Sequence, residues 1–179
     1  MQKIYKPVVN PDTRIALTGF MGVGKTSVAR HLANMLRCDR LDLDALIEVN
    51  EQRRIAEIID ADGEAAYRDI ETENLGRALE KTSVRILSLG GGTWTVAENR
   101  DLIHEHGLTS VWLDSSFNHC WNNIRHSRKE RPLARNKIAA KKLFDERQEV
   151  YCLADWHFVV KPDLTSFDIA RQIFEEVFS

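Results

Sequence analysis

The sequence predicts a single α/β domain built on a parallel sheet. Short apolar runs alternate with longer segments in which apolar residues recur every three or four positions, and this alternation is typical of consecutive β-α units. A glycine-rich loop at residues 19–26 joins the first apolar run to the first helical segment. The 179 residues leave room for one domain, because domains most often span about 100–150 residues.

Five apolar runs are the candidates for strands. Three of them are rich in branched or aromatic residues, which is typical of strands covered on both faces. The second run is more polar, with Arg40 beside Leu41, so we expect it at an edge of the sheet. The predicted strands are residues 14–18, 39–42, 84–89, 110–113 and 157–160.

Two helices have clear sequence signals. The first opens near Gly24, and its apolar stripe comprises Val28, Leu32, Met35 and Leu36. The last begins at Thr165, three residues before Asp168, which is the spacing of a capping box. Residues 1–12 are interpreted as an N-terminal extension, so the domain is expected to span 13–179.

The composition excludes several classes of protein. It is 43% hydrophobic and 29% charged, as in globular chains, and its net charge of -2 does not suit a general nucleic-acid binder. The three cysteines form no C-x-x-C pair, so neither a disulfide framework nor a thiolate zinc site is indicated. No signal segment and no run of 18 apolar residues is present. We therefore expect a cytoplasmic protein.

The loop at residues 19–26 reads G-F-M-G-V-G-K-T and matches the P-loop pattern G-x-x-x-x-G-K-[ST]. Its glycines let main-chain amides surround a phosphate, and the helix N-terminus adds partial positive charge. Lys25 would reach the β- and γ-phosphates of ATP, and the hydroxyl of Thr26 would bind Mg²⁺. The expected nucleotide contacts from this loop are Gly22, Val23, Gly24, Lys25, Thr26 and Ser27.

A dinucleotide-binding loop is the alternative interpretation. Gly22 and Gly24 have the spacing of that fingerprint, with acidic residues about twenty positions further on. Ser27 stands where the third glycine is required, and a Lys-Thr pair has no role in such a loop. Binding of a nucleoside triphosphate is therefore favoured.

Two aspartates, Asp42 and Asp44, lie at the carboxyl end of the second predicted strand. Open α/β sheets bind their ligands at the carboxyl ends of strands, so one carboxylate could hold the metal and the other could receive a hydroxyl proton. The alternative is that one of them only caps the helix predicted at residues 45–51.

Two further polar features accompany these aspartates. Gly90, Gly91 and Gly92 close the third predicted strand, where a glycine run lets a ligand approach the backbone or simply forms a turn. Arg68 and Glu71 share one face of a predicted helix, where a surface salt bridge is the simplest interpretation.

A strongly basic segment spans residues 125–142. It contains one acid and eight basic residues, namely Arg125, Arg128, Lys129, Arg131, Arg135, Lys137, Lys141 and Lys142. This charge, together with Pro132 and poor periodicity before Asn136, predicts a mobile lid at about 125–136 that closes over polyphosphate. A solvated surface is an alternative, as is a nucleic-acid patch, although no aromatic residues are interleaved for stacking.

The ordered motifs resemble the shikimate kinase family from about residue 14 to residue 178. They are G-F-M-G-V-G-K-T, L-D-L-D-A-L-I-E, D-G-E-A-A-Y-R-D-I-E, L-S-L-G-G-G, E-R-P-L-A and F-D-E-R-Q-E-V-Y. The resemblance implies a three-layer α/β/α P-loop kinase fold with a five-stranded parallel sheet in the order 2-3-1-4-5. It also implies transfer of the γ-phosphoryl group of ATP to the 3-hydroxyl of shikimate, with Mg²⁺ as cofactor.

The resemblance assigns roles to individual residues. Lys25 and Thr26 would hold ATP and Mg²⁺, and Asp42 would lie in the outer shell of the metal. Asp44 would orient or deprotonate the substrate hydroxyl, and Arg131 would reach the phosphates from the lid. The implied substrate contacts are Asp44, Arg68, Gly90, Gly91, Gly92 and Arg147. The implied adenine contacts are Arg125 and residues 161–163.

Four residues, Ile59, Tyr67, Thr93 and Trp94, differ from the usual family pattern. They concern the fit of the substrate ring, and Trp94 is a further candidate for a ligand contact. The alternatives are therefore an aminoshikimate or gluconate kinase, or a kinase-like module that binds ligand without catalysis. We expect a monomer that acts on a small molecule, with no nucleic-acid or membrane partner.

Overall fold

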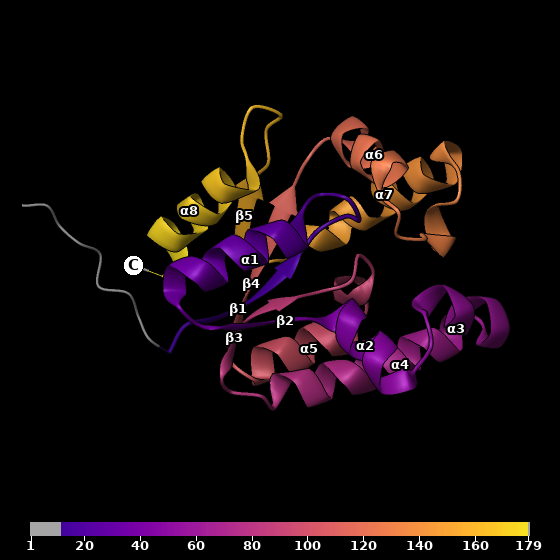
Figure 1. The fold of residues 1–179 in the computed structure, drawn as a ribbon, viewed down its shortest axis with the longest axis horizontal. Coiled ribbons are helices and arrows are strands. Elements are labelled where there is room, and N and C mark those ends of the chain that lie inside the picture. The colour runs from indigo at the N-terminus through magenta and orange to yellow at the C-terminus, as the bar shows by residue number, and fades with distance from the viewer. Residues whose placement is uncertain (1–11, 179) are drawn as a thin grey trace, which may run out of the picture.

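The computed structural model describes residues 12–178, which form a five-stranded sheet between two layers of helices (Figure 1). All neighbouring strands are parallel, and their order is β2-β3-β1-β4-β5. The predicted α/β/α fold and sheet order are therefore confirmed. The predicted extension at residues 1–12 lies, apart from Asp12, outside the described residues. The strands are β1 (Arg14–Thr18), β2 (Asp39–Asp42), β3 (Val84–Ser88), β4 (Leu108–Asp114) and β5 (Trp156–Val159).

The central strands carry the apolar residues of the core. Ile15 of β1 pairs with Ile86 of β3 and with Thr109 of β4, and Ile15 and Ile86 are fully buried. The strand β2 is at an edge, as its polar residues predict. The strand β4 is longer than the predicted 110–113, because Leu108 and Thr109 pair with β1.

Helices cover both faces of the sheet. The helices α1 (Lys25–Leu36) and α8 (Ser166–Val177) pack together on one face, while α4 (Glu64–Leu79) and α5 (Ala97–Glu105) cover the other (Figure 1). The predicted capping box of α8 is present, since Thr165 Oγ1 accepts from the Asp168 N–H and the Asp168 carboxylate accepts from the Thr165 N–H. This local signal fixed the start of the helix.

The remaining helices flank the carboxyl ends of the strands. They are α2 (Leu43–Glu51), α3 (Ile55–Asp62), α6 (Phe117–His126) and α7 (Lys137–Tyr151), with two short 3₁₀ turns, η1 (Thr93–Thr95) and η2 (Pro132–Ala134). The P-loop follows β1, Asp42 ends β2, and the glycine run follows β3. Parallel strands end at the same edge of a sheet, so these motifs meet there. Within residues 12–178, no helix is long and apolar enough to cross a membrane.

Candidate active site

The P-loop is held in shape by α6. Gly19, Gly22 and Gly24 all have positive φ angles, which glycine adopts without strain. A Cβ atom on Gly22 would lie 2.6 Å from the carbonyl oxygen of Cys120, so only glycine allows this approach to α6. The side-chain amide of Asn123 also donates to the Gly22 carbonyl at 2.7 Å. Sequence reasoning missed Asn123, because its partner is distant in the chain.

Lys25 lies inside the loop. Its Nζ donates to the carbonyl oxygens of Gly19 at 2.6 Å and Phe20 at 3.1 Å. Burial, followed by the nearby guanidinium of Arg131, lowers the pKa of Lys25 to about 8. A phosphate bound in the loop would give this ammonium a negatively charged partner, which the two carbonyl oxygens do not provide.

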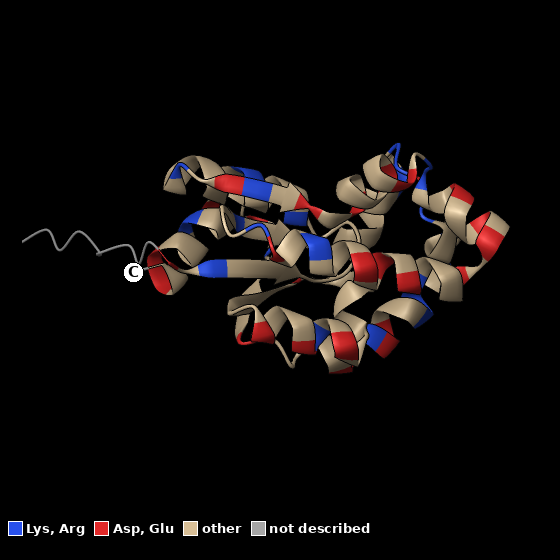
Figure 2. Ribbon diagram, turned by 90° about the horizontal axis from the view of Figure 1, so that it is seen from below, with Lys and Arg blue, Asp and Glu red and all other residues tan. Residues whose placement is uncertain are grey.

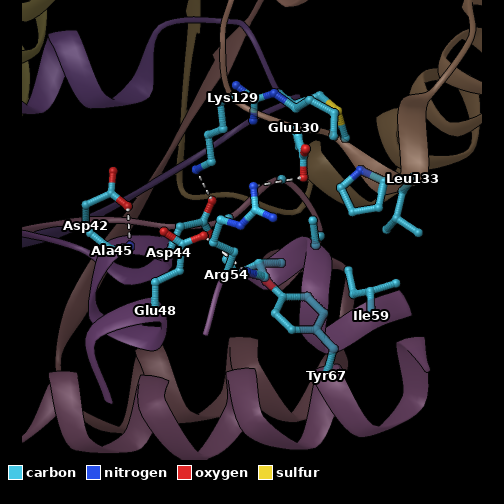
Figure 3. A pocket seen from close by; sticks show the side chains of 18 of the residues that line it. Asp42, Asp44, Ala45, Glu48, Arg54, Ile59, Tyr67, Lys129, Glu130 and Leu133 are labelled. Atoms are coloured by element: carbon cyan, nitrogen blue, oxygen red, sulfur yellow. Dashed lines mark hydrogen bonds and ion pairs between the residues drawn. The ribbon is translucent and has the colours of Figure 1, made fainter. Parts of the chain in front are cut away.

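Asp42 has the capping role that the sequence offered as an alternative, and it also contacts the P-loop. Its Oδ2 accepts a hydrogen bond from Thr26 Oγ1 at 2.9 Å, which joins the end of β2 to the start of α1. Its Oδ1 accepts from the Ala45 N–H at 3.2 Å and caps α2 (Figure 3). The predicted start of this helix at residue 45 is therefore wrong: α2 begins at Leu43, and Asp44 lies in its first turn.

Asp44 faces the space between α2 and the segment that links α6 to α7. Its Oδ2 forms an ion pair of 2.8 Å with Lys129 Nζ (Figure 3). Its Oδ1 is buried and has no hydrogen-bond partner among the described residues. Figure 2 shows Lys and Arg gathered on the linking segment, in agreement with the basic composition of the predicted lid.

Each glycine of the run at 90–92 lies against a different polar side chain. A Cβ atom on Gly90 would lie 2.8 Å from Asp44 Oδ1, and one on Gly91 would lie 3.2 Å from Arg147 Nη1. A Cβ atom on Gly92 would overlap the guanidinium of Arg68. The run is therefore more than a turn, because the missing side chains leave room for three polar groups to converge.

The simple interpretation of Arg68 and Glu71 as a surface salt bridge is wrong. The Glu71 side chain is fully buried and accepts from Arg68 at 2.6 Å, from Thr93 Oγ1 at 2.7 Å and from the Tyr67 hydroxyl at 3.2 Å. Burial disfavours the charge on Arg68, but the Glu71 carboxylate outweighs it and raises the pKa of Arg68. Burial and Glu71 raise the pKa of Tyr67, which keeps its hydroxyl a donor.

Two further arginines have buried nitrogen atoms without a hydrogen-bond partner in the described part of the chain. Arg147 of α7 is 6% exposed, and its Nη1 has no hydrogen-bond partner among the described residues. The same holds for Nε of Arg131, which precedes η2, and burial lowers the pKa of Arg131. Buried guanidinium atoms without partners are costly unless a ligand completes their hydrogen bonds.

Two adjoining cavities contain these groups. The larger, of about 650 Å³, is lined by residues that include Asp44, Arg68, Gly90, Gly91, Gly92, Arg131 and Arg147. The smaller, of about 420 Å³, is lined by residues that include Gly22, Gly24, Lys25, Thr26, Ser27, Asp42, Asp44 and Arg131. Thr26, Asp42 and Asp44 line both, so the P-loop opens directly toward the larger cavity.

The side chains of some predicted residues do not line these two cavities. Val23 is buried in the core, and Arg125 lines a third cavity with Trp121 on the α3 side of α6. Trp94 does not reach a ligand cavity: it is fully buried, and its Nε1 donates to the Val150 carbonyl at 3.0 Å. Ile59 does line the larger cavity, next to Tyr67 (Figure 3).

Phosphoryl transfer requires a cradle for phosphate beside a place for the acceptor, and the two adjoining cavities provide both. This fold and site define the class of P-loop phosphotransferases. A model of the shikimate kinase family matches residues 21–178. The chain belongs to the shikimate kinase family.

Individual members of the family are similar over most of the chain. A shikimate kinase of Ruegeria pomeroyi is 40% identical over 144 residues, which cover 79% of this chain and 72% of the relative. The solved structure of the Acinetobacter baumannii shikimate kinase in complex with shikimate is 28% identical, with a TM-score of 0.85 and 92% of each chain covered. The solved structure of the Aquifex aeolicus shikimate kinase is 30% identical, with a TM-score of 0.78. The match covers 92% of this chain and 96% of the Aquifex chain.

Proposed function

We propose that this protein transfers the γ-phosphoryl group of ATP to the 3-hydroxyl of shikimate. The observation that carries the proposal is the convergence of Arg68 and Arg147 at the glycine run, across from the P-loop. A planar guanidinium matches a carboxylate with two parallel hydrogen bonds, so a pair of them selects a carboxylate-bearing acceptor. The shikimate bound to the Acinetobacter relative is such an acceptor.

The residues at the P-loop fit ATP and Mg²⁺. Lys25 and the loop amides would bind the phosphates, and the unpartnered Nε of Arg131 would complete its hydrogen bonds on them. Thr26 would bind the metal directly, with Asp42 behind it, as their 2.9 Å hydrogen bond supports. Bound Mg²⁺ would neutralise charge on the phosphate oxygens.

The acceptor hydroxyl would bind to Asp44. Its buried Oδ1 has no partner among the described residues and lies on the floor formed by Gly90, so it is free to accept a hydroxyl proton. Lys25 and Arg131 would stabilise the negative charge of the phosphoryl group during transfer. The ring of the acceptor would lie against Ile59 and Tyr67, which line the same cavity.

The segment at 125–136 would act as the lid. Two ion pairs join this segment to α3 and to the residue before it. Arg135 pairs with Asp60 of α3 at 2.6 Å, and Glu130 pairs with Arg54, which precedes α3, at 3.6 Å. Residues of the segment also line the acceptor cavity, and together with the two ion pairs this supports the proposal that the segment closes during the reaction. The adenine contact expected of Arg125 and the monomeric state stay predictions.

A coupled assay for ADP release tests the proposed function. It is run with Mg²⁺ and ATP and with shikimate, aminoshikimate or gluconate as acceptor, and Lys25→Met is the inactive control. We expect the highest kcat/KM with shikimate, because gluconate lacks the rigid ring that fixes the distance between carboxylate and hydroxyl, and aminoshikimate carries an amino group in place of one hydroxyl. A preference for gluconate would favour the related kinase. Shikimate binding in calorimetry without ADP release would indicate a module that does not catalyse.

A further inference from the structure

One residue of the lid, Lys129, contacts the carboxylate of Asp44 at the acceptor cavity. Lys129 lies between α6 and α7, 85 positions from Asp44 in the chain, yet its Nζ is 2.8 Å from Asp44 Oδ2 (Figure 3). The Asp44 side chain is 19% exposed and that of Lys129 is 45% exposed. The pair therefore lies at the mouth of the cavity and is partly shielded from water.

The two oxygens of Asp44 have different surroundings. Lys129 contacts Oδ2, whereas Oδ1 is buried over Gly90 and has no hydrogen-bond partner among the described residues. A carboxylate has about four acceptor positions, so one oxygen can bind a lysine while the other binds a hydroxyl. Lys129 and an acceptor hydroxyl therefore do not compete for the same atom.

Two contacts restrain the segment around Lys129, one within the lid and one to the residue before α3. Its own N–H donates to Ser127 Oγ at 3.1 Å, and the next residue, Glu130, forms the ion pair with Arg54. Lys129 lines both the acceptor cavity and the P-loop cavity. A restrained lysine at this junction can hold a carboxylate in one orientation.

We propose that Lys129 is a positioning residue, which holds Asp44 by Oδ2 so that Oδ1 faces the acceptor hydroxyl. This inference rests on the proposed function. It also couples the lid to the chemistry: when the lid leaves the cavity, Asp44 loses its partner and its fixed orientation. Catalytic groups work best when neighbouring side chains lock their geometry in advance.

Three variants test the inference in the coupled assay. Lys129→Met should lower kcat with shikimate by about tenfold, since coupling within such a charged pair is typically worth that factor, and should leave the KM for ATP unchanged. Lys129→Arg should recover most of the activity. The matched control is Lys142→Met on α7, because Lys142 is 79% exposed and, within residues 12–178, its one ion pair is with Glu146, so its kinetics should equal those of the wild type.

A double-mutant cycle separates positioning from direct contact with phosphate. In an Asp44→Asn background, Lys129→Met should change the residual kcat by less than about twofold, because the route through the carboxylate is already removed. The inference would be overturned if the kcat losses of Asp44→Asn and Lys129→Met multiplied in the double variant. It would also be overturned if Lys129→Met turned over shikimate as fast as the wild type. Circular dichroism melting of each variant identifies a folding defect. If Lys129→Met proves to be misfolded, the activity of Lys129→Arg decides whether the inference holds. An inactive wild type would instead refute the proposed function.

Discussion

The charge on Lys25 depends on what fills the P-loop. In the described structure its ammonium binds only carbonyl oxygens, and burial lowers its pKa to about 8. A bound triphosphate favours the protonated form, so the pKa of Lys25 must rise on binding. Above about pH 8 the free protein has partly lost this proton, and binding must take it up again.

The affinity for ATP should therefore fall by about twofold between pH 7 and pH 8 and more steeply above pH 8. The limiting slope is about tenfold per pH unit, because one proton is taken up. Calorimetry in buffers of different ionisation enthalpy measures both the affinity and the proton uptake. Lys25→Arg, which keeps its proton, is the control. An affinity that is flat up to pH 9.5 in the wild type would contradict this assignment.

The role of a residue could be predicted from the sequence where the residue belongs to a local motif. Lys25 and Thr26 belong to such a motif, and the structure places both at the P-loop cavity. The role of Glu71 could not be predicted, because its burial depends on Tyr67 and Thr93 from two different elements. The local signals were the spacings of Tyr67 and Arg68 from Glu71, four and three residues along one helix.

At the scale of elements, the glycine run lines the acceptor cavity and leads into the turn η1. Gly92 has an ordinary negative φ of -106°, so the backbone conformation does not require glycine here. The absence of a side chain instead leaves room for a neighbouring group. The guanidinium of Arg68 occupies that space. A side chain at this position must displace Arg68 from Glu71 or distort the turn.

Gly92→Ala should raise the KM for shikimate by about tenfold or more, since one charge-assisted hydrogen bond is worth about 1.5–3 kcal/mol. The KM for ATP should stay unchanged, because Gly92 does not line the P-loop cavity. Gly76→Ala is a matched control on α4, the helix of Arg68, because a Cβ atom there has no neighbour within 4 Å. It should leave both KM values unchanged and stabilise the fold by up to about 1 kcal/mol. Equal shikimate KM values for both variants would contradict the assignment.

Elements with complete local signals were predicted well, and those fixed by tertiary contacts were not. The start of α8 follows from the capping box, and β1 has its predicted bounds. The true length of β4 depends on pairing with its neighbours, and the start of α2 depends on the cap that Asp42 provides. Neither pairing nor capping geometry is visible in hydrophobic periodicity.

At the scale of the whole molecule, the acceptor site is assembled from distant parts of the chain. Arg68 comes from α4, Arg147 from α7 and Asp44 from α2, and the sheet brings them to one edge. Only the resemblance to the family pointed to both arginines, because nothing in the local sequence pairs residues 79 positions apart. In the proposed function, acceptor recognition therefore depends on the fold, and nucleotide binding depends on the local P-loop motif.

The most direct test of this arrangement is the ratio of kcat/KM for shikimate to that for its carboxamide. Each ratio is measured on one protein sample, so a partly misfolded fraction cancels. We expect the wild type to favour the carboxylate by about 100-fold or more, because two charge-assisted contacts each contribute about 1.5–3 kcal/mol. In Arg147→Gln the ratio should fall at least about tenfold. A ratio near one in the wild type, or an equal ratio in the variant, would contradict recognition by the paired arginines.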